Sequence, residues 1–318
     1  MNKKRIIIVT IFIILTIVSL IIGPNMNLIK ELFEGNQLAW TNFVYGRIPR
    51  TVVIILAASS LSVAGLIMQS VSRNKFISPS TAGTSNAAML GVLIGYLFLG
   101  SQSLSVKFGF AFIFAMASSF VFIFLLNKIK FKNVIYVPLI GMMYGALISA
   151  IATFIAHQTN SLQILAGLNL ATFSHITLLN STLLLILIPA MIAAFIFSAS
   201  FGVVALGEDF SKNLGVNYKF VMAIALIIIS AISASTVVVV GPLPFVGLII
   251  PNIVTVYYGD NIKKSIFDIA LIGSIFVLLN DIISRLIIFP YEVAVGFTMG
   301  ITGAIIFLIL IFKKGKKI

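Results

Sequence analysis

The feature that most constrains this chain is a repeated pattern of uncharged apolar runs, each long enough to cross a lipid bilayer. The run from Thr51 to Ser72 holds no charged residue, and a helix of roughly 20 residues spans the ~30 Å hydrocarbon core of a bilayer. Of the 318 residues, 60% are hydrophobic and only 9% are charged, against about 25% charged residues in soluble domains. The sequence therefore predicts an all-α integral membrane protein, with residues 1–318 forming a single transmembrane domain.

Ten apolar runs predict about ten transmembrane helices. Pro242, Pro244 and Pro251 interrupt the eighth run, and because proline removes a backbone N–H and breaks helices, we expect that span to be short or broken. The first run also has the basic start and apolar body of a secretory signal; we interpret it as a retained helix because no convincing cleavage site follows. The predicted spans cover residues 6–23, 51–71, 82–100, 106–126, 134–156, 178–200, 220–240, 243–258, 267–288 and 293–312.

The lysines and arginines between the spans predict the orientation, because positive residues accumulate in cytoplasmic loops. With the N-terminus inside, sixteen of the 21 lysines and arginines lie on the cytoplasmic side. An even number of spans then places both termini in the cytoplasm. The net charge of +13 follows from this topology, so no nucleic-acid partner is needed to explain it. Five basic residues remain outside: Lys30, Arg47, Arg50, Lys107 and Arg285.

Three of these outer arginines are candidate binding residues. Arg47 and Arg50 flank Pro49 at the outer mouth of the second span, where they either reach lipid phosphates or meet an anionic partner. Arg285 follows Asp281 by four residues, which is the spacing of a structural ion pair on a helix. The sequence by itself leaves both alternatives open for each arginine.

The cytoplasmic side holds two further polar features. Gln69 and Asn74 mark the inner end of the second span, where a polar helix end is the simplest explanation. The joint between the sixth and seventh spans is amphipathic and begins with Glu208 and Asp209 in an otherwise basic region. With Gly215 as its expected stop, this joint predicts a short interfacial helix, although a plain connector would fit the pattern as well.

Several absences exclude classes of protein. The chain has no cysteine, so it forms no disulfide and no thiolate metal site. His157 and His175 lack a nearby carboxylate and make a poor metal site. There is no Gly-x4-Gly-Lys-Ser/Thr loop for ATP and no catalytic His-Glu-x-x-His or Gly-x-Ser-x-Gly motif. No acid lies in the middle of a span, where ion-driven carriers commonly use one. We therefore expect no cofactor, no bound metal and no enzymatic activity, but a pathway driven by another component.

At this point the motifs resemble those of FecCD-type permeases, the membrane subunits of ABC importers for ferric siderophores, haem and cobalamin. The resemblance begins with Arg-Ile-Pro-Arg at residues 47–50 and Gly-Leu-Ile-Met-Gln at 65–69, and continues through Arg-Asn at 73–74. It includes Gly-Pro-Leu-Pro-Phe-Val-Gly-Leu-Ile-Ile-Pro at 241–251 and Asp-Ile-Ile-Ser-Arg at 281–285. The matching motifs keep the same order over residues 40–312. The residues that match the family's structural motifs are Gln69, Asn74, Pro79, Gly83, Gly247, Pro251, Asp281, Glu292 and Gly296.

The resemblance implies the ABC type II importer permease fold, with an inverted repeat of spans two to five and seven to ten. It implies a dimer of permeases, identical or similar, driven by a cytoplasmic ABC ATPase dimer in the bacterial cell membrane. By their positions in the family motifs, Arg47, Arg50 and Arg285 would meet glutamates of an extracytoplasmic siderophore-binding protein. The residues implied to couple the permease to the ATPase are Glu208, Asp209, Leu214 and Gly215.

The chain departs from the family pattern at several prolines and at Asn252, where the family has a histidine. These departures indicate a divergent branch. They leave the substrate subclass open but not the transport class. The branch that we expect is that of ferric-siderophore permeases, with haem or cobalamin as an alternative substrate and an ion-coupled secondary carrier as a more distant alternative. A membrane-embedded enzyme acting through Gln69, Asn74 or His157 would lack an activated nucleophile.

Overall fold

The computed structural model describes residues 3–23, 28–100, 103–128, 136–259 and 261–315. Within these ranges every regular element is helical, apart from one isolated bridge between Ile288 and Tyr291. The first predicted span, residues 6–23, lies within the described residues. The fifth, residues 134–156, is described from Tyr136 onward. Lys130 and Lys132 lie outside the described residues. The helices are α1 Lys3–Ile21, α2 Leu28–Phe33, α3 Gln37–Asn42, the π-helical turn η1 Phe43–Arg47, α4 Ile48–Val71, α5 Thr84–Leu99, α6 Leu104–Lys128, α7 Tyr136–Gln158, α8 Leu162–Asn169, α9 Leu178–Ser181, the 3-10 turn η2 Thr182–Ile186, α10 Leu187–Ile196, α11 Ser198–Val204, α12 Glu208–Asn213, α13 Tyr218–Val239, α14 Val246–Tyr258, α15 Ile262–Leu286 and α16 Val295–Gly315.

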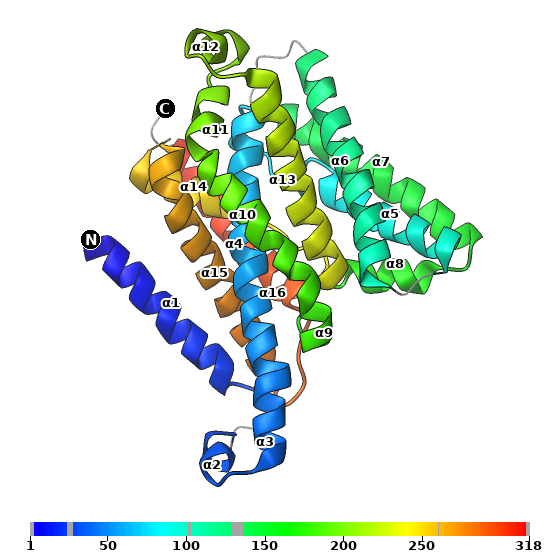
Figure 1. The fold of residues 1–318 in the computed structure, drawn as a ribbon, viewed down its shortest axis with the longest axis vertical. Helices are drawn as coiled ribbons and strands as arrows, with labels where there is room; N and C mark the ends of the chain where they lie inside the picture. The colour runs from blue at the N-terminus through cyan, green and yellow to red at the C-terminus, as the bar shows by residue number, and fades with distance from the viewer. Residues whose placement is uncertain (1–2, 24–27, 101–102, 129–135, 260, 316–318) are drawn as a thin grey trace.

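Each predicted span corresponds to a helix or to a bent pair of helices. Five helices among the described residues are long and apolar enough to cross a membrane, and one bent pair passes the same test. Four shorter apolar helices, in α1, α5, α14 and α16, account for the remaining predicted spans. The protein is therefore a multi-pass membrane protein of about ten spans, and the long helices run side by side in Figure 1.

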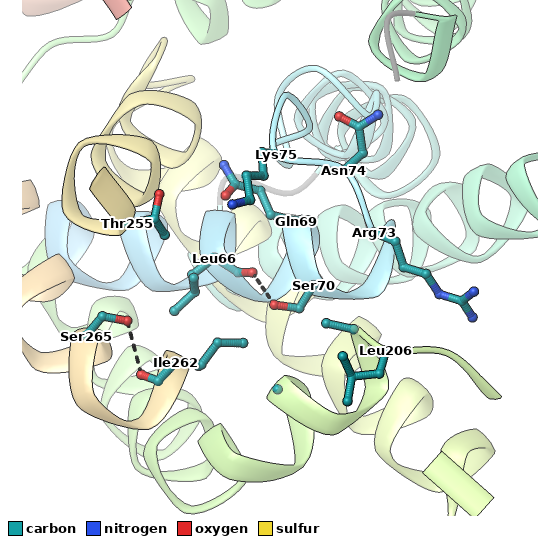
Figure 2. A pocket seen from close by; sticks show the side chains of 12 residues that line it. Leu66, Gln69, Ser70, Arg73, Asn74, Lys75, Leu206, Thr255, Ile262 and Ser265 are labelled. Atoms are coloured by element: carbon teal, nitrogen blue, oxygen red, sulfur yellow. Dashed lines mark hydrogen bonds between the residues drawn. The ribbon is translucent and has the colours of Figure 1, made fainter. Parts of the chain in front are cut away.

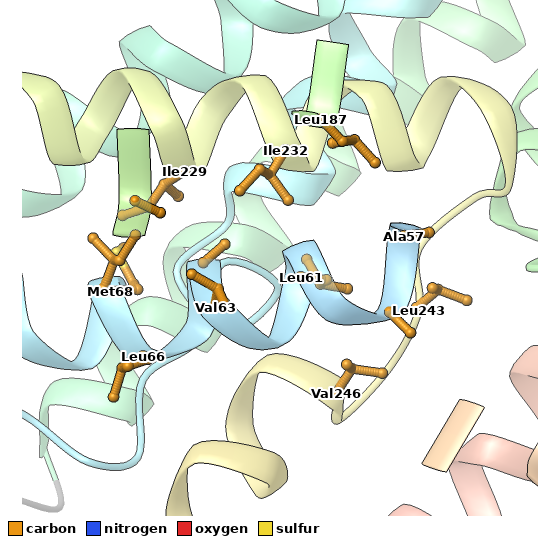
Figure 3. Packing of buried hydrophobic residues seen from close by; sticks show 14 of the residues in the cluster. Ala57, Leu61, Val63, Leu66, Met68, Leu187, Ile229, Ile232, Leu243 and Val246 are labelled. Atoms are coloured by element: carbon orange, nitrogen blue, oxygen red, sulfur yellow. The ribbon is translucent and has the colours of Figure 1, made fainter. Parts of the chain in front are cut away.

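Helix α4 lies at the centre of this bundle (Figure 1), and it is buried along most of its length. Ala57, Ala58 and Ala64 are fully buried, and small residues allow helix backbones to approach closely in a membrane. Figure 3 shows larger apolar side chains from α4 and α13, such as Met68 and Ile232, meeting in the same core.

The helix contacts have the pairing that the inverted repeat predicts. Helix α4 packs against α15 and α14, and α13 packs in the corresponding way against α6 and α5. The two helices also pack against each other. Gly83 and Phe245 begin α5 and α14 with φ angles of 77° and 66°, so the turns that follow α4 and α13 share a left-handed residue at the same point.

The second predicted span does not end at its arginines. Helices α3 and α4 form one continuous helix, Gln37–Val71, of 35 residues, although Pro49 lies inside it. A proline in a helix has no N–H and its ring clashes with the carbonyl four residues earlier. The π-helical turn η1 lies immediately before Pro49, and such a turn loosens the backbone where the clash would occur. The outer part of this helix therefore continues well beyond the predicted span.

Two other predicted spans differ from straight helices. The sixth is bent by 61° between Ile196 and Ser198, where the Ser198 hydroxyl donates to the Phe195 carbonyl at 2.7 Å and so competes with the helical hydrogen bonds. The eighth is the short helix α14, which contains Pro251. The expectation of a short eighth span is confirmed.

Candidate functional site

The polar residues singled out in the sequence gather at the two ends of the bundle. We call the end that holds Arg47 and Arg50 the arginine end, and the opposite end, which holds α12, the α12 end. Helix α4 runs from one to the other, and α15 runs back. Helices α2 and α3 project at the arginine end in Figure 1, and α12 caps the other.

At the arginine end, Arg50 lies between two carboxylates of the chain itself. Its Nη2 donates to Asp281 Oδ1 at 2.8 Å, and its Nη1 donates to Glu292 Oε1 at 2.8 Å. The Asp281 side chain is fully buried, whereas those of Arg50 and Glu292 are 14% and 19% exposed. Arg50 thus joins α4 to α15 and to the segment that precedes α16.

Arg285 forms the structural helix pair that its spacing allowed. Its Nη2 is bonded to Asp281 Oδ2, and only 4% of its side chain is exposed. The same guanidinium donates to the carbonyl oxygens of Ser19 at 3.0 Å and Ile22 at 2.7 Å. These carbonyls belong to the end of α1, where no further helical N–H is available to them.

Arg47 supports the same helix end. Its Nη1 donates to the carbonyl of Leu20 at 3.2 Å and to that of Ile21, and its guanidinium covers Gly23. A cation stabilises a helix C-terminus because the helix dipole leaves partial negative charge there. Arg47 and Arg285 together therefore cap α1 and hold it against α4 and α15.

The structure brings together five of the predicted residues in one network: Arg47, Arg50, Arg285, Asp281 and Glu292. It also adds the carbonyls at the end of α1, which sequence reasoning missed. No motif marks those carbonyls, since every helix end has them; only the fold shows which helix end the arginines reach. Their part in docking a partner stays a prediction.

The family motif residues in the last two turns of α4 form a close crossing with α14. A Cβ on Gly65 would lie 2.0 Å from the Gly247 carbonyl oxygen, so only glycine fits there. Pro79 lies against Gly247, and Gln69 Nε2 donates to the Leu248 carbonyl at 3.3 Å. These residues set how closely the two helices approach.

Asn252 takes a structural role at the place where the family has histidine. Its Nδ2 donates to the carbonyls of Leu248 at 2.8 Å and Lys75 at 2.6 Å. It therefore ties α14, at the residue directly after Pro251, to the loop that follows α4.

Three other motif residues shape turns and helix starts. Asn74 Oδ1 accepts a hydrogen bond at 2.9 Å from the amide two residues later. Gly83, in its left-handed conformation, lies against the Gly145 backbone of α7. Gly296 lies against Ala171, and its N–H donates to the Ala171 carbonyl at 3.1 Å. They hold the short helices α5 and α16 in place.

A cavity of about 670 Å³ opens between α7, α16 and the loops that precede α5 and α14. No charged side chain lies among the residues that line it. Its polar lining consists of hydroxyl and amide side chains from Ser78, Ser80, Thr81, Asn86, Ser149 and Asn169.

At the α12 end, the short helix expected after the sixth span is confirmed. Helix α12 begins at Glu208 and ends before Gly215, whose φ of 74° closes it in a left-handed turn. Lys212 Nζ lies 2.9 Å from Glu208 Oε1. The hydrogen bond from Lys212, and then its charge, lower the pKa of the Glu208 carboxyl, and Glu208 raises the pKa of Lys212. Asp209 is exposed beside them.

Helix α12 and the residues that flank it also present an apolar stripe that no described residue covers. Leu206, Phe210 and Leu214 follow one another at four-residue spacing, and their side chains are 59%, 63% and 61% exposed. Side chains four apart lie on the same face of a helix. Leu206 and Leu214 bound the segment that resembles the family's coupling segment, and the four-residue spacing is the sequence signal that adds Phe210.

A second cavity, of about 280 Å³, lies beneath this end of the bundle (Figure 2). It is lined from four sides, by Leu66 and Ser70 of α4, Leu206 before α12, Thr255 of α14 and Ser265 of α15. The cavity separates the inner end of α4 from the segment that leads into α12.

The two histidines lie apart from these sites. The His175 Nε2 is 3.0 Å from the Val239 carbonyl, and His157 lies in the last turn of α7. Within the described ranges, no group of three or more histidine, aspartate or glutamate side chains is placed to hold a metal ion.

Comparison with known families identifies the class of protein. A family model described as the FecCD transport family matches residues 9–313. The match covers nearly the whole chain, so the chain belongs to the FecCD transport family and is a transport permease.

Among similar proteins, the petrobactin import system permease protein YclN of Bacillus subtilis is 43% identical over 302 residues, which cover 95% of this chain and 96% of that protein. The ferric-anguibactin transport system permease protein FatD of Vibrio anguillarum is 37% identical, with 96% and 97% of the two chains covered.

A solved structure described as an inward-facing conformation of a metal-chelate type ABC transporter has the same fold. Its TM-score is 0.81 at 21% identity, and the match covers 98% of this chain and all of the other.

Proposed function

We propose that this chain is the membrane-spanning permease subunit of an ABC importer that moves ferric-siderophore complexes into the cytoplasm, powered by a separate ATPase. The observation that carries the proposal is the similarity, over nearly the full length of both chains, to permeases named for petrobactin import and ferric-anguibactin transport. On this proposal the chain conducts its substrate and is not an enzyme.

The exposed stripe of Leu206, Phe210 and Leu214 supports an ATPase partner at the α12 end. An amphipathic helix that offers apolar residues at four-residue spacing fits a hydrophobic groove of another protein. The neighbouring Glu208 and Asp209 add charge at the rim of that contact, where charge governs orientation more than affinity. The cytoplasm would then lie on this side, with both termini there.

The arginine end suits a soluble partner outside the membrane. The helix Gln37–Val71 has 35 residues, about 52 Å at 1.5 Å per residue, whereas the hydrocarbon core measures only ~30 Å. The tip beyond Arg47 therefore stands outside the hydrocarbon, and it exposes Phe33 and Leu38 by 90% and 71%.

We expect a siderophore-binding protein to meet this tip together with Arg47 and Arg50. Carboxylates on that protein would compete with Glu292 for Arg50, and both of these side chains are partly exposed. Arg285, nearly fully buried, would act by holding Asp281 and the end of α1 in place.

The uncharged cavity beside α7 and α16 supports a path at the interface with a second permease. The α7 face next to it is apolar and exposed at Met142, Met143 and Leu147. An identical or similar permease would cover this face and complete the path.

The test is uptake of radioactive iron as ferric petrobactin, ferric anguibactin, haem iron or labelled cobalamin in a strain that lacks this chain. We expect uptake of at least one ferric siderophore to be lost and to return with the wild-type chain. Loss of only haem or cobalamin uptake would favour those alternatives. Uptake by proteoliposomes that contain this chain alone under an ion gradient would instead make it a secondary carrier.

A further inference from the structure

Arg73 occupies a backbone position that usually belongs to glycine. Helix α4 ends in a Schellman turn, in which the Asn74 N–H donates to the Gln69 carbonyl at 3.0 Å and the Arg73 N–H to the Ser70 carbonyl at 3.2 Å. Arg73 takes the left-handed position of this turn with a φ of 51°. Glycine is preferred there because a Cβ is strained in that conformation. A bulky residue held in such a conformation points to a use for its side chain.

The side chain of Arg73 reaches both ends of the α12 segment. Its guanidinium lies over Gly207, where a Cβ would be 3.2 Å from Nη1, and its Nη2 donates to the Tyr218 hydroxyl at 3.3 Å. Its positive charge also helps to lower the pKa of Glu208. Gly207 precedes the first residue of α12, and Tyr218 begins α13. The side chain of Arg73, in the turn that ends α4, therefore contacts the residue before α12 and the first residue of α13.

Helix α12 connects to α4 through Arg73 and through α11, which packs against α4. Its main helix contacts are with its chain neighbours α11 and α13. The 280 Å³ cavity lies between the inner end of α4 and the α11–α12 joint, and Figure 2 shows Arg73 extending from the end of α4 on the side where Leu206 lies. The cavity leaves room for the joint to shift, while the arginine keeps the joint attached to α4.

We propose that Arg73 is a positioning residue that fixes the α12 segment to α4, so that a movement of α12 is passed to the central helix and from there toward the arginine end. This inference rests on the proposed function, in which α12 receives the ATPase. Arg73 touches neither the transported chelate nor ATP; it acts through Gly207 and Tyr218.

The test compares Arg73→Gly with Arg73→Asn and Lys219→Ala. Glycine and asparagine both tolerate the left-handed conformation, so neither variant should melt below the wild-type protein, yet both remove the guanidinium. Lys219 also lowers the pKa of Glu208, so its replacement removes nearby charge without removing the link. The chain has no cysteine, so a single spin label at Asn213→Cys reports the mobility of α12.

Two readouts are needed: the mobility of that label in the purified chain, and the ATP hydrolysed per ferric petrobactin imported by the importer assembled with its host's ATPase and binding protein. We expect both Arg73 variants to loosen the label and to raise ATP consumption per chelate about fivefold, the shift that loss of one exposed hydrogen bond worth about 1 kcal/mol produces. Lys219→Ala should match the wild type.

Three results would overturn the inference. The Arg73 variants could match the wild type in both readouts, Lys219→Ala could reproduce their effect, or only Arg73→Gly could differ, which would assign the effect to backbone freedom. A wild-type assembly that imports neither this chelate nor another siderophore would instead contradict the proposed function, while the label mobility would still test the link.

Discussion

Arg50 and Arg285 share one buried carboxylate, that of Asp281. Two guanidinium groups that are shielded from water repel each other. The negative charge of the Asp281 carboxylate offsets this repulsion only while the carboxylate keeps its hydrogen bonds to both arginines. Glu292 supplies a second carboxylate to Arg50 from a more exposed position. At the residue scale, the arginine end is therefore a charge network in which one aspartate is central.

We predict that Asp281→Asn destabilises the chain by about 3–5 kcal/mol, the usual cost of removing one partner of a buried ion pair. Thermal unfolding of the purified protein in detergent measures this. Glu292→Gln should cost less, because its side chain is partly exposed. Glu34→Gln is the matched control: Glu34 pairs with Lys30 on the surface, so its loss should change stability by less than about 1 kcal/mol. Equal melting temperatures for all three variants would contradict the central role of Asp281.

At the element scale, α12 combines a defined start and stop with an apolar face that stays exposed in the described part of the chain. Gly207 and Gly215 both have positive φ angles, so the helix is fixed in length by its ends. Its six residues are too few to form a stable helix alone. The helix is held by its ends and by the Glu208 to Lys212 pair, which leaves its exposed face free for a partner.

We predict that Phe210→Ser abolishes copurification of the ATPase. The free energy of unfolding of the isolated chain should stay within about 0.5 kcal/mol of the wild-type value, as for other exposed sites. The apolar side chain is 63% exposed, so its loss removes a partner contact and little internal contact. Ile192→Ser, at an exposed position on α10, is the control and should keep the ATPase. Copurification of the ATPase with Phe210→Ser would place its binding surface elsewhere.

At the scale of the whole molecule, the loops between consecutive spans must alternate between the two sides of the membrane. Helix α1 connects the two ends: Arg5 bonds to the buried Asp268 near the start of α15, and the other end of α1 meets Arg285. The pairs of α4 with α15 and of α13 with α6 then repeat one arrangement in opposite orientations.

We predict that single cysteines at Phe33 and Leu99 react with a membrane-impermeant maleimide in intact cells, whereas cysteines at Lys219 and Lys263 react only after the cells are opened. All four positions are exposed, and the natural chain contributes no background thiol. Labelling followed by gel shift measures the outcome. Reaction of Lys219→Cys in intact cells would reverse the orientation or change the number of spans.

The number of spans and the short helix α12 could be predicted because both depend on local sequence. An uncharged run long enough to cross the bilayer can form little other than a membrane-spanning helix. Gly215 ends α12 regardless of where that helix lies in the fold. The continuation of α4 through Pro49 was not predictable in the same way, since a π-helical turn forms only when surrounding contacts hold the helix together on both sides.

The arginines show most clearly which features cannot be predicted from the sequence. Their positions beside Pro49 and after Asp281 allowed a lipid, a partner or a helix pair, and the sequence by itself could not choose among them. Arg50 and Glu292 are 242 positions apart, and Arg285 and Ser19 are 266 positions apart. Sequence by itself thus determined the membrane-spanning class, the number of spans and the ends of α12, because hydrophobic length and turn residues act locally. Only the tertiary structure decided which charges meet, because contacts between distant helices depend on how the whole bundle packs.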